Sequence, residues 1–309
     1  MDGKAGNGRV ASSRRQARGV SFFDLAQKLN PKICYGGDKM AYVDKNDLTK
    51  IFQDTQNFYD SDATLKAAIQ KSIDGTKFYY AEDYPPLPEK TFDKTLITVT
   101  HGRTFDTAVN LRVKNPSVRI AVHNFASATN PGGGVIHGSR AQEESLCRCS
   151  TLYPALDTNE NWRRYYDFHR KRNDSLYTDA CIFTPNIIIF KSDIDLPQRL
   201  PRENWVTVDV MTCAAPNLRH TSLNDDELLK IHEKRGRHML TILAHHGVEI
   251  FVTGAFGCGA FINNPYVVAQ AYKNILPDFN GYFKEIVFAI YCTPYEIKNF
   301  DAFNKILAR

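Results

Sequence analysis

The sequence of 309 residues has no apolar run long enough to cross a bilayer, since the longest, residues 187–190 and 248–256, are of strand length. It also has no internal repeat, and no low-complexity tract beyond its first twenty residues. With 43% hydrophobic and 24% charged residues, the composition argues against disorder, a collagen-like chain and a disulfide scaffold. The sequence therefore indicates a globular protein with apolar material for one large core or two modest domains.

Metal-binding and disulfide patterns are also missing. The seven cysteines are odd in number, and Cys181, Cys213 and Cys292 lie in apolar, strand-like runs, which indicates reduced, buried thiols in an intracellular protein. Cys147 and Cys149 lie two apart in an expected helix and so do not share a helix face. No other Cys/His pair has zinc spacing. We expect no metal, no cofactor, and a cytoplasmic location in a prokaryote or a nuclear or cytoplasmic one in a eukaryote.

The positive charge is concentrated at the start of the chain. Residues 1–20 contain five basic side chains and one acidic one, so most of the formal net charge of +5 belongs to them and the rest is nearly neutral. This segment is rich in Gly, Ser and Arg, which predicts a flexible tail. It lacks the apolar region of a secretory signal and the clear amphipathic pattern of a transit peptide. We expect no membrane partner, and no direct nucleic-acid binding apart from this tail.

Residues 21–93 are predicted to form a helical N-terminal extension. Helices are expected over residues 21–29 and 46–58, and Ser61 is expected to cap a third that ends at Gly75. Residues 84–88 are proline-rich and predict a stiff connector to the next domain.

Residues 94–309 are predicted to form an α/β domain, because strands alternate with helices there. The expected strands are residues 96–100, 118–125, 186–190, 205–211, 249–253 and 285–291. The expected helices are residues 104–113, 139–153, 225–246, 265–276 and 294–307, the third capped by Asn224 and the fourth by Asn264. This order predicts an α/β fold with a largely parallel sheet. We interpret His245 and His246 as cations favoured at a helix C-terminus rather than as a metal or catalytic site.

Two glycine-rich segments follow expected strands, where open α/β sheets bind ligands. In the first, residues 130–134, three consecutive glycines suit a close approach of backbone to ligand. Ser139 and Gln142 have the spacing of a capping box, which places Gln142, Glu143 and Glu144 at a helix start. Neighbouring helical residues point about 100° apart, so one glutamate can face a leaving group while the other anchors the ligand. The alternative is a pair of solvated acids near the positive end of the helix dipole.

The second segment, residues 254–261, matches neither the G-x-G-x-x-G nor the Walker A pattern and contains no lysine. A phosphate held there would be bound by backbone N–H groups and the helix that begins near Pro265. Phe261 can pack either against a sugar or base or into the core.

These residues resemble one known family. Asn130-Pro131-Gly132-Gly133-Gly134, seven intervening residues and then Gln142-Glu143-Glu144 are similar to the GGG-x(6–8)-QEE signature of poly(ADP-ribose) glycohydrolases. The likeness is to the bacterial type, a macrodomain with an N-terminal extension. Residues 208–210, 214–217 and 254–259 also resemble segments of that family, in the same order.

The resemblance implies a macrodomain-like three-layer α/β/α sandwich with a mixed, largely parallel sheet. It implies cleavage of ribose–ribose O-glycosidic bonds in poly(ADP-ribose) with ADP-ribose as product, and hence reversal of ADP-ribosylation, as in the DNA damage response. Poly(ADP-ribose) or ADP-ribosylated macromolecules would be the partners. In position, Glu144 matches the catalytic acid, and Glu143 matches its neighbour, which positions the ribose.

The resemblance also implies binding roles for other residues. Asn130 matches an asparagine that contacts the same ribose. Gln142 belongs to the signature, and Gly132, Gly133 and Gly134 match the loop that lies against the ligand. The diphosphate-binding loop and the aromatic position beside it are matched by Gly257, Cys258, Gly259, Ala260 and Phe261. Glu144 would protonate the departing oxygen of an oxocarbenium-like transition state, then activate water. Because a helix N-terminus lowers a carboxyl pKa, burial and Glu143 must oppose that effect.

Other functions stay open from the sequence. A macrodomain that binds ADP-ribose without cutting it would need no acid at Glu144. A hydrolase of ADP-ribose on a protein side chain or a nucleic-acid base would use the same residues. A dehydrogenase predicts a G-x-G-x-x-G motif after the first strand, which residues 101–103 do not supply. The choice between exo and endo cleavage depends on loops around the adenosine end of the ligand. We place that end near residues 101–106, only because this segment follows the first expected strand.

Overall fold

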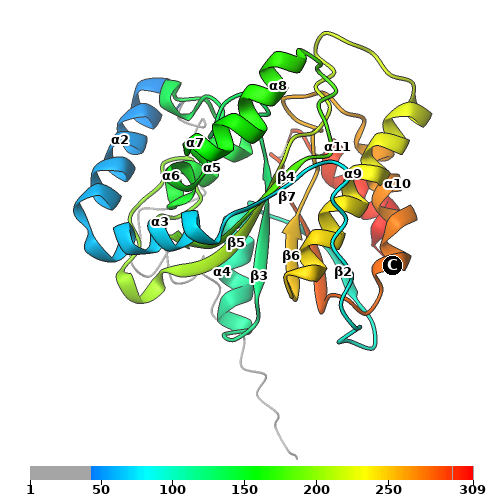
Figure 1. Cartoon of the computed structure of the whole chain (residues 1–309), viewed down its shortest axis with the longest axis horizontal. Coiled ribbons are helices and arrows are strands. Elements are labelled where there is room, and N and C mark those ends of the chain that lie inside the picture. The colour runs from blue at the N-terminus through cyan, green and yellow to red at the C-terminus, as the bar shows by residue number, and fades with distance from the viewer. Residues whose placement is uncertain (1–42, 294, 309) are drawn as a thin grey trace, which may run out of the picture. The chain divides into compact units, whose positions relative to one another are not determined.

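The computed structural model describes residues 43–293 and 295–308. Within them a seven-stranded sheet has the order β1-β4-β5-β3-β6-β7-β2 (Figure 1). The strands are β1 (Lys77–Tyr79), β2 (Leu96–His101), β3 (Ile120–Phe125), β4 (Cys181–Ile189), β5 (Val206–Cys213), β6 (Ile250–Thr253) and β7 (Glu285–Ile290). Strand β4 runs antiparallel to β1 and β5, and the other neighbours are parallel. The prediction of a mixed, largely parallel sheet is confirmed.

Two features of the sheet differ from the prediction. Strand β4 begins at Cys181 rather than near residue 186, because a β-bulge between Thr184 and Ile187 lets Pro185, which has no N–H, lie within the strand. Asn186 in the bulge has a left-handed φ of 61°. Strand β1 was not predicted, since three residues are too short to show a period.

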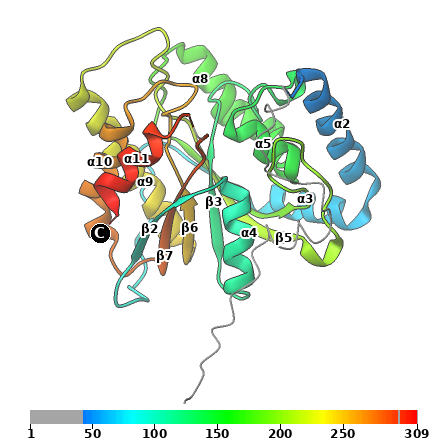
Figure 2. The same cartoon turned by 180° about the vertical axis from the view of Figure 1, so that it is seen from behind.

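Helices cover both faces of the sheet. The helices of eight or more residues are α2 (Lys45–Ser61), α3 (Ala63–Gly75), α4 (Thr104–Lys114), α5 (Gln142–Cys149), α9 (Asp225–His245), α10 (Pro265–Ile275) and α11 (Lys298–Leu307). Met239 and Leu243 of α9, Tyr272 of α10 and Phe303 of α11 belong to one buried cluster with strand side chains. A fully buried aliphatic or aromatic side chain contributes about 1.5–3 kcal/mol. Helix α4 lies on the opposite face from α9 (Figures 1 and 2).

The predicted helix over residues 139–153 is wrong in its extent. Helix α5 ends at Cys149 because Ser150 adopts an extended backbone and forms a β-bridge with Ile189. A separate short helix, α6 (Leu152–Leu156), follows. The last helix begins at Lys298, whereas its predicted start, Pro294, lies outside the described residues.

A second helical stretch was not predicted. It consists of α7 (Asn159–Asn161), a π-helical turn η2 (Trp162–Tyr166) and α8 (Asp167–Arg172), which continue one another. Short 3₁₀ turns complete the structure at η1 (Val135–His137), η3 (Arg202–Asn204) and η4 (Leu276–Phe279).

The helical part of the predicted extension packs against the sheet. Helix α2 is close to its prediction, but Asp62 rather than Ser61 caps α3, because Ser61 is the last residue of α2. Strand β1 pairs with β4, so this segment supplies an edge of the same sheet. The predicted tail 1–20 and helix 21–29 lie outside the described residues. No helix within the described ranges combines the length and apolar character needed to span a membrane.

Candidate active site

A cavity of about 940 Å³ opens at the carboxyl ends of the parallel strands. Its walls come from loops that follow β2, β3, β5, β6 and β7, together with the start of α5. Of the residues singled out from the sequence, its lining includes Asn130, Gly133, Gly134, Gln142, Glu143, Glu144, Gly257, Gly259, Ala260 and Phe261. The two glycine-rich segments, far apart in the chain, therefore face one cavity.

The first glycine loop has a backbone that requires glycine. Gly132 and Gly133 have φ values of +66° and +58°, in the left-handed region. A Cβ on Gly133 would lie 2.6 Å from Oε1 of Glu144 and 3.1 Å from Oε2 of Glu143. The loop therefore lies directly against both carboxyl groups, closer than any other residue type allows.

Gln142 attaches the start of α5 to the end of β3. Its Nε2 donates to the carbonyl of His123 at 2.7 Å and to Oγ1 of Thr104 at 3.2 Å, and its Oε1 accepts the N–H of Phe125 at 2.9 Å. The capping box predicted for Ser139 is therefore wrong, because the Gln142 side chain is used for these bonds and the helix begins after Ala141 without a side-chain cap. Gln142 thereby fixes the two glutamates that follow it.

Glu143 is buried, with 2% of its surface exposed. Its Oε1 accepts a hydrogen bond from the Asn124 side-chain amide at 3.1 Å, and its Oε2 accepts the N–H of Ser127 at 2.7 Å. Burial, reinforced by the neighbouring Glu144, raises its pKa to about 8, although the two donors favour the charged form. Glu143 therefore holds a proton at neutral pH in the ligand-free protein.

Glu144 is also buried, and only one of its two carboxyl oxygens accepts a hydrogen bond among the described residues. Its Oε1 accepts the N–H of Gly134 at 2.9 Å. Its Oε2 is buried without a hydrogen-bond partner among the described residues. A buried polar atom of this kind costs free energy unless a ligand meets it. Because Glu144 lines the cavity, this oxygen is suited to a substrate atom.

Helix α2 supports the glycine loop from behind. Oγ1 of Thr55 donates to the carbonyl of Arg148 in α5 at 2.6 Å, and Arg148 donates to the carbonyl of Ser139 at 2.7 Å. Gly138 has a φ of +69°, and a Cβ there would lie 2.3 Å from the carbonyl oxygen of Lys45. Residues before position 94 thus take part in building the site.

The second glycine loop is shaped by contacts with the loop after β5. Gly257 has a φ of +78°, and a Cβ there would meet the Ala215 methyl at 2.6 Å. Nothing within 4 Å would meet a Cβ on Gly259, so this residue faces open space. Asn263, which ends the loop, donates its side-chain amide to the carbonyls of Pro216 and Phe261.

Buried polar residues on α9, missed from the sequence, hold these loops. Nε2 of His232 lies 2.7 Å from Oδ1 of Asn263, and burial lowers the His232 pKa to about 4, so the ring is neutral. The Arg235 guanidinium pairs with Asp179 at 3.0 Å and donates to the carbonyl of Ala214 at 2.7 Å. Their only signal was polarity on the buried face of an amphipathic helix.

Three predicted site residues need comment. Gly132 and Cys258 lie outside the cavity lining: a Cβ on Gly132 would contact Tyr153, and the Cys258 thiol points to the carbonyl of Phe256. Asn130 lines the cavity, and its Oδ1 accepts a hydrogen bond from Arg170 at 2.6 Å. The roles assigned to all site residues stay predictions.

The region assigned by position to the adenosine end contributes to the cavity in part. Gly102, Arg103 and Thr104 line it, whereas His101 lines a smaller hollow nearby. The Arg103 guanidinium lies 4.4 Å from the centroid of the Tyr291 ring. Tyr291 also lines the cavity, and no sequence motif predicted it.

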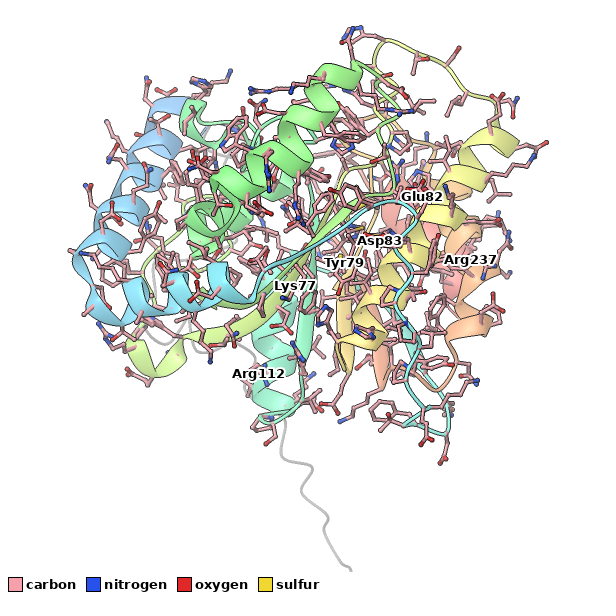
Figure 3. The ribbon with its side chains drawn as sticks, viewed as in Figure 1. Lys77, Tyr79, Glu82, Asp83, Arg112 and Arg237 are labelled. Atoms are coloured by element: carbon pink, nitrogen blue, oxygen red, sulfur yellow. The ribbon has the colours of Figure 1, made fainter. Side chains whose placement is uncertain are left out.

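The tandem histidines have a structural role. His246 stacks on Phe183 with ring centroids 3.9 Å apart and lies 2.8 Å from the hydroxyl of Tyr79. Tyr79 lies in β1 together with Lys77 (Figure 3). Burial lowers the pKa of His246 to about 4, so the expectation of a cation at the helix C-terminus is wrong for this residue. Nδ1 of His245 lies 3.0 Å from the carbonyl of Pro86. The described ranges contain no cluster of three or more His, Cys, Asp or Glu side chains arranged to hold a metal.

The fold and cavity define an α/β protein of the macrodomain-like class, with paired carboxyl groups against a glycine loop. Residues 49–192 match the model of the microbial-type poly(ADP-ribose) glycohydrolase catalytic domain. That stretch includes the glycine loop and both glutamates. Among curated proteins, no significant sequence match is found.

Solved structures agree. Poly(ADP-ribose) glycohydrolase from Thermomonospora curvata is 28% identical, with a TM-score of 0.76 over 85% of this chain and 100% of that one. The enzyme from Deinococcus radiodurans in complex with ADP-ribose is 33% identical, with a TM-score of 0.68 over 77% of this chain and 96% of that one. The chain belongs to the poly(ADP-ribose) glycohydrolase family.

Proposed function

We propose that this chain hydrolyses the ribose–ribose O-glycosidic bonds of poly(ADP-ribose) and releases ADP-ribose, with Glu144 as the catalytic acid. The observation that carries the proposal is the Oε2 atom of Glu144, buried at the cavity wall without a partner among the described residues. Family membership supports the substrate, because a related enzyme binds ADP-ribose and another binds the inhibitor ADP-HPD.

The reaction needs a proton at the leaving oxygen. Both oxygens of Glu143 accept N–H donors, whereas Oε2 of Glu144 has no partner among the described residues, so this oxygen is the one available to the leaving group. Glu144 gives that proton to the departing ribose oxygen as the C–O bond breaks, which leaves an oxocarbenium-like sugar. The Glu144 carboxylate then removes a proton from the attacking water.

The remaining site residues bind and orient the substrate. Each oxygen of Glu143 keeps a lone pair that can accept a ribose hydroxyl, and Asn130 also lines the cavity. The diphosphate lies against the second glycine loop, where Gly259 leaves space for it and backbone N–H groups face an anion. Its negative charge stabilises the cationic sugar. Phe261 packs beside the bound ligand.

The test measures ADP-ribose released from automodified, poly(ADP-ribosyl)ated protein. Wild type and Glu144→Gln are compared, because Gln keeps the size of the side chain and cannot give or take the proton. We expect release by wild type, a loss of at least about 100-fold in Glu144→Gln, and retained ADP-ribose binding. If wild type binds ADP-ribose but releases none from the polymer, the protein either binds ADP-ribose without cutting it or acts on another ADP-ribose linkage.

A further inference from the structure

Residues 159–174 are the helical stretch from α7 to α8 and the two residues after it, and they are basic. The catalytic proposal does not use them. The stretch contains Arg163, Arg164, Arg170, Lys171 and Arg172 against three acidic side chains. His169 within it is neutral, since burial lowers its pKa to about 4. The stretch therefore has an excess of two positive charges in a chain that is nearly neutral beyond its first twenty residues.

Local ion pairs leave part of this charge available. Arg163 and Arg164 both pair with Glu160, so one carboxylate serves two guanidinium groups. The side chain of Arg163 is 71% exposed. Lys171 is exposed and forms no ion pair within the described ranges. Exposed pairs of this kind are weak and are readily exchanged for another anion.

This basic stretch reaches the catalytic cavity at Trp162. Trp162, at its start, lines the cavity together with Glu144. The Arg170 guanidinium lies 4.6 Å from the Trp162 ring centroid and donates to the carbonyl of Thr129 at 2.8 Å, next to Asn130. Trp162 also begins a π-helical turn, a feature common at functional sites. Helix α8 lies at the upper end of the molecule in Figure 1.

The substrate suggests what occupies this surface. The proposed function places one ADP-ribose unit between the two glycine loops, so the polymer on the other side of the cleaved bond lies beyond that unit. That segment repeats a diphosphate and a purine ring. Cationic side chains beside an exposed aromatic ring are the means by which proteins hold a charged strand of bases.

We propose that Trp162, Arg163, Arg164 and Lys171 bind the poly(ADP-ribose) segment on the leaving-group side of the scissile bond. This inference rests on the proposed function and deepens it. The arginine and lysine side chains contact the diphosphates of the next units, and Trp162 stacks on the adenine nearest to the cavity. The surface therefore favours polymer over an isolated ADP-ribose unit.

The test compares two substrates that differ only in what lies beyond the scissile bond. One is long poly(ADP-ribose), and the other is ADP-ribose with a 4-nitrophenyl group at the anomeric carbon. In Arg163→Gln/Lys171→Gln, we expect KM for polymer to rise about fivefold at low salt, with kcat/KM for the nitrophenyl substrate unchanged. The slope of log(kcat/KM) for polymer against log salt falls by about 1.4, since each lost phosphate contact removes about 0.7.

Two further variants serve as a matched control and as a test in the opposite direction. Lys66→Gln/Lys71→Gln removes the same charge from the exposed face of α3, outside the cavity lining, and leaves both substrates unaffected. Glu160→Gln releases Arg163 and Arg164 from their shared carboxylate and lowers KM for polymer about twofold, the opposite direction. Thermal unfolding verifies that all variants are folded.

The outcomes separate the two proposals. If wild type cleaves neither substrate, the proposed function fails. If it cleaves both, and Arg163→Gln/Lys171→Gln has an unchanged KM and salt slope for polymer, the surface does not bind the leaving segment. If an RNA oligonucleotide of equal phosphate number inhibits polymer cleavage as strongly as added polymer does, and the double variant relieves it, the surface is a nucleic-acid site instead.

Discussion

The contact between the glycine loop and the carboxyl pair predicts a specific effect of Gly133→Ala. An alanine at a φ of +58° costs about 1–2 kcal/mol in the left-handed region. Its Cβ would lie 2.6 Å from Oε1 of Glu144, so that oxygen must move by about half an ångström or more to reach an ordinary contact. Because this oxygen is the end of a flexible side chain, the move is cheap in stability. It also displaces Oε1 from its position opposite the N–H of Gly134, the bond that orients the Glu144 carboxyl group.

We therefore expect a small loss of stability and a large loss of activity. A misplacement of about 1 Å can reduce turnover by about 100-fold. The assay is ADP-ribose release from poly(ADP-ribosyl)ated protein at saturating substrate, with thermal unfolding measured in parallel. We expect kcat to fall by about 30- to 100-fold and the free energy of unfolding by about 1–2 kcal/mol.

Gly247→Ala is the matched control. Gly247 has a φ of +68°, nothing lies within 4 Å of its Cβ position, and it is outside the cavity lining. It should lose the same stability and keep its activity. The reasoning is refuted if Gly133→Ala keeps kcat within about threefold of wild type, or if Gly247→Ala loses activity to the same degree.

Three further predictions concern the supports of the site. Gln142→Ala removes three hydrogen bonds between α5 and its neighbours and should lower the free energy of unfolding by about 2–3 kcal/mol in urea; a loss below about 1 kcal/mol contradicts that role. Burial raises the pKa of Glu143 from 4.5 to about 8, so the folded protein keeps a proton that the unfolded chain has lost. The Tm of the ligand-free protein should therefore decrease as the pH is raised from about 5 to about 9, and it should decrease less in Glu143→Gln. If Tm falls with pH equally steeply in both proteins, Glu143 is not the cause. Asp179→Ala leaves the Arg235 guanidinium buried without its carboxylate and should cost about 3–5 kcal/mol by chemical unfolding, whereas a near-neutral result would mean that the backbone carbonyls alone satisfy Arg235.

Local sequence patterns predicted the helix starts correctly where the capping bonds join residues that are close in the chain. The capping box at Asn224 and Glu227 closes the start of α9, and Asn264 with Pro265 begins α10. Both depend on bonds that span two or three residues, so the sequence determines them. The alternation of apolar strands and helices likewise determined the class of fold.

Two predictions from local sequence patterns were wrong because the side chain interacts with residues far away in the chain. Gln142 has capping-box spacing from Ser139, yet it bonds to β3, some twenty residues earlier, and to Thr104. His246 lies at a helix C-terminus, yet its half-buried ring stacks on Phe183 and is neutral. Burial and long-range hydrogen bonds outweigh a helix dipole or a cap, and neither is encoded in a short window of sequence.

The sequence alone predicted the segments of the candidate site: a glycine loop, two glutamates and a second glycine-rich turn, which the structure brings to one cavity. Only the tertiary structure decided their states and their supports. It buried Glu143 and raised its pKa, left one oxygen of Glu144 without a partner among the described residues, and placed Trp162 at the cavity beside a basic helix. The reason is physical: residue type fixes which chemistry is available, whereas desolvation, charge proximity and the path of a bound polymer depend on atoms brought together from distant parts of the chain.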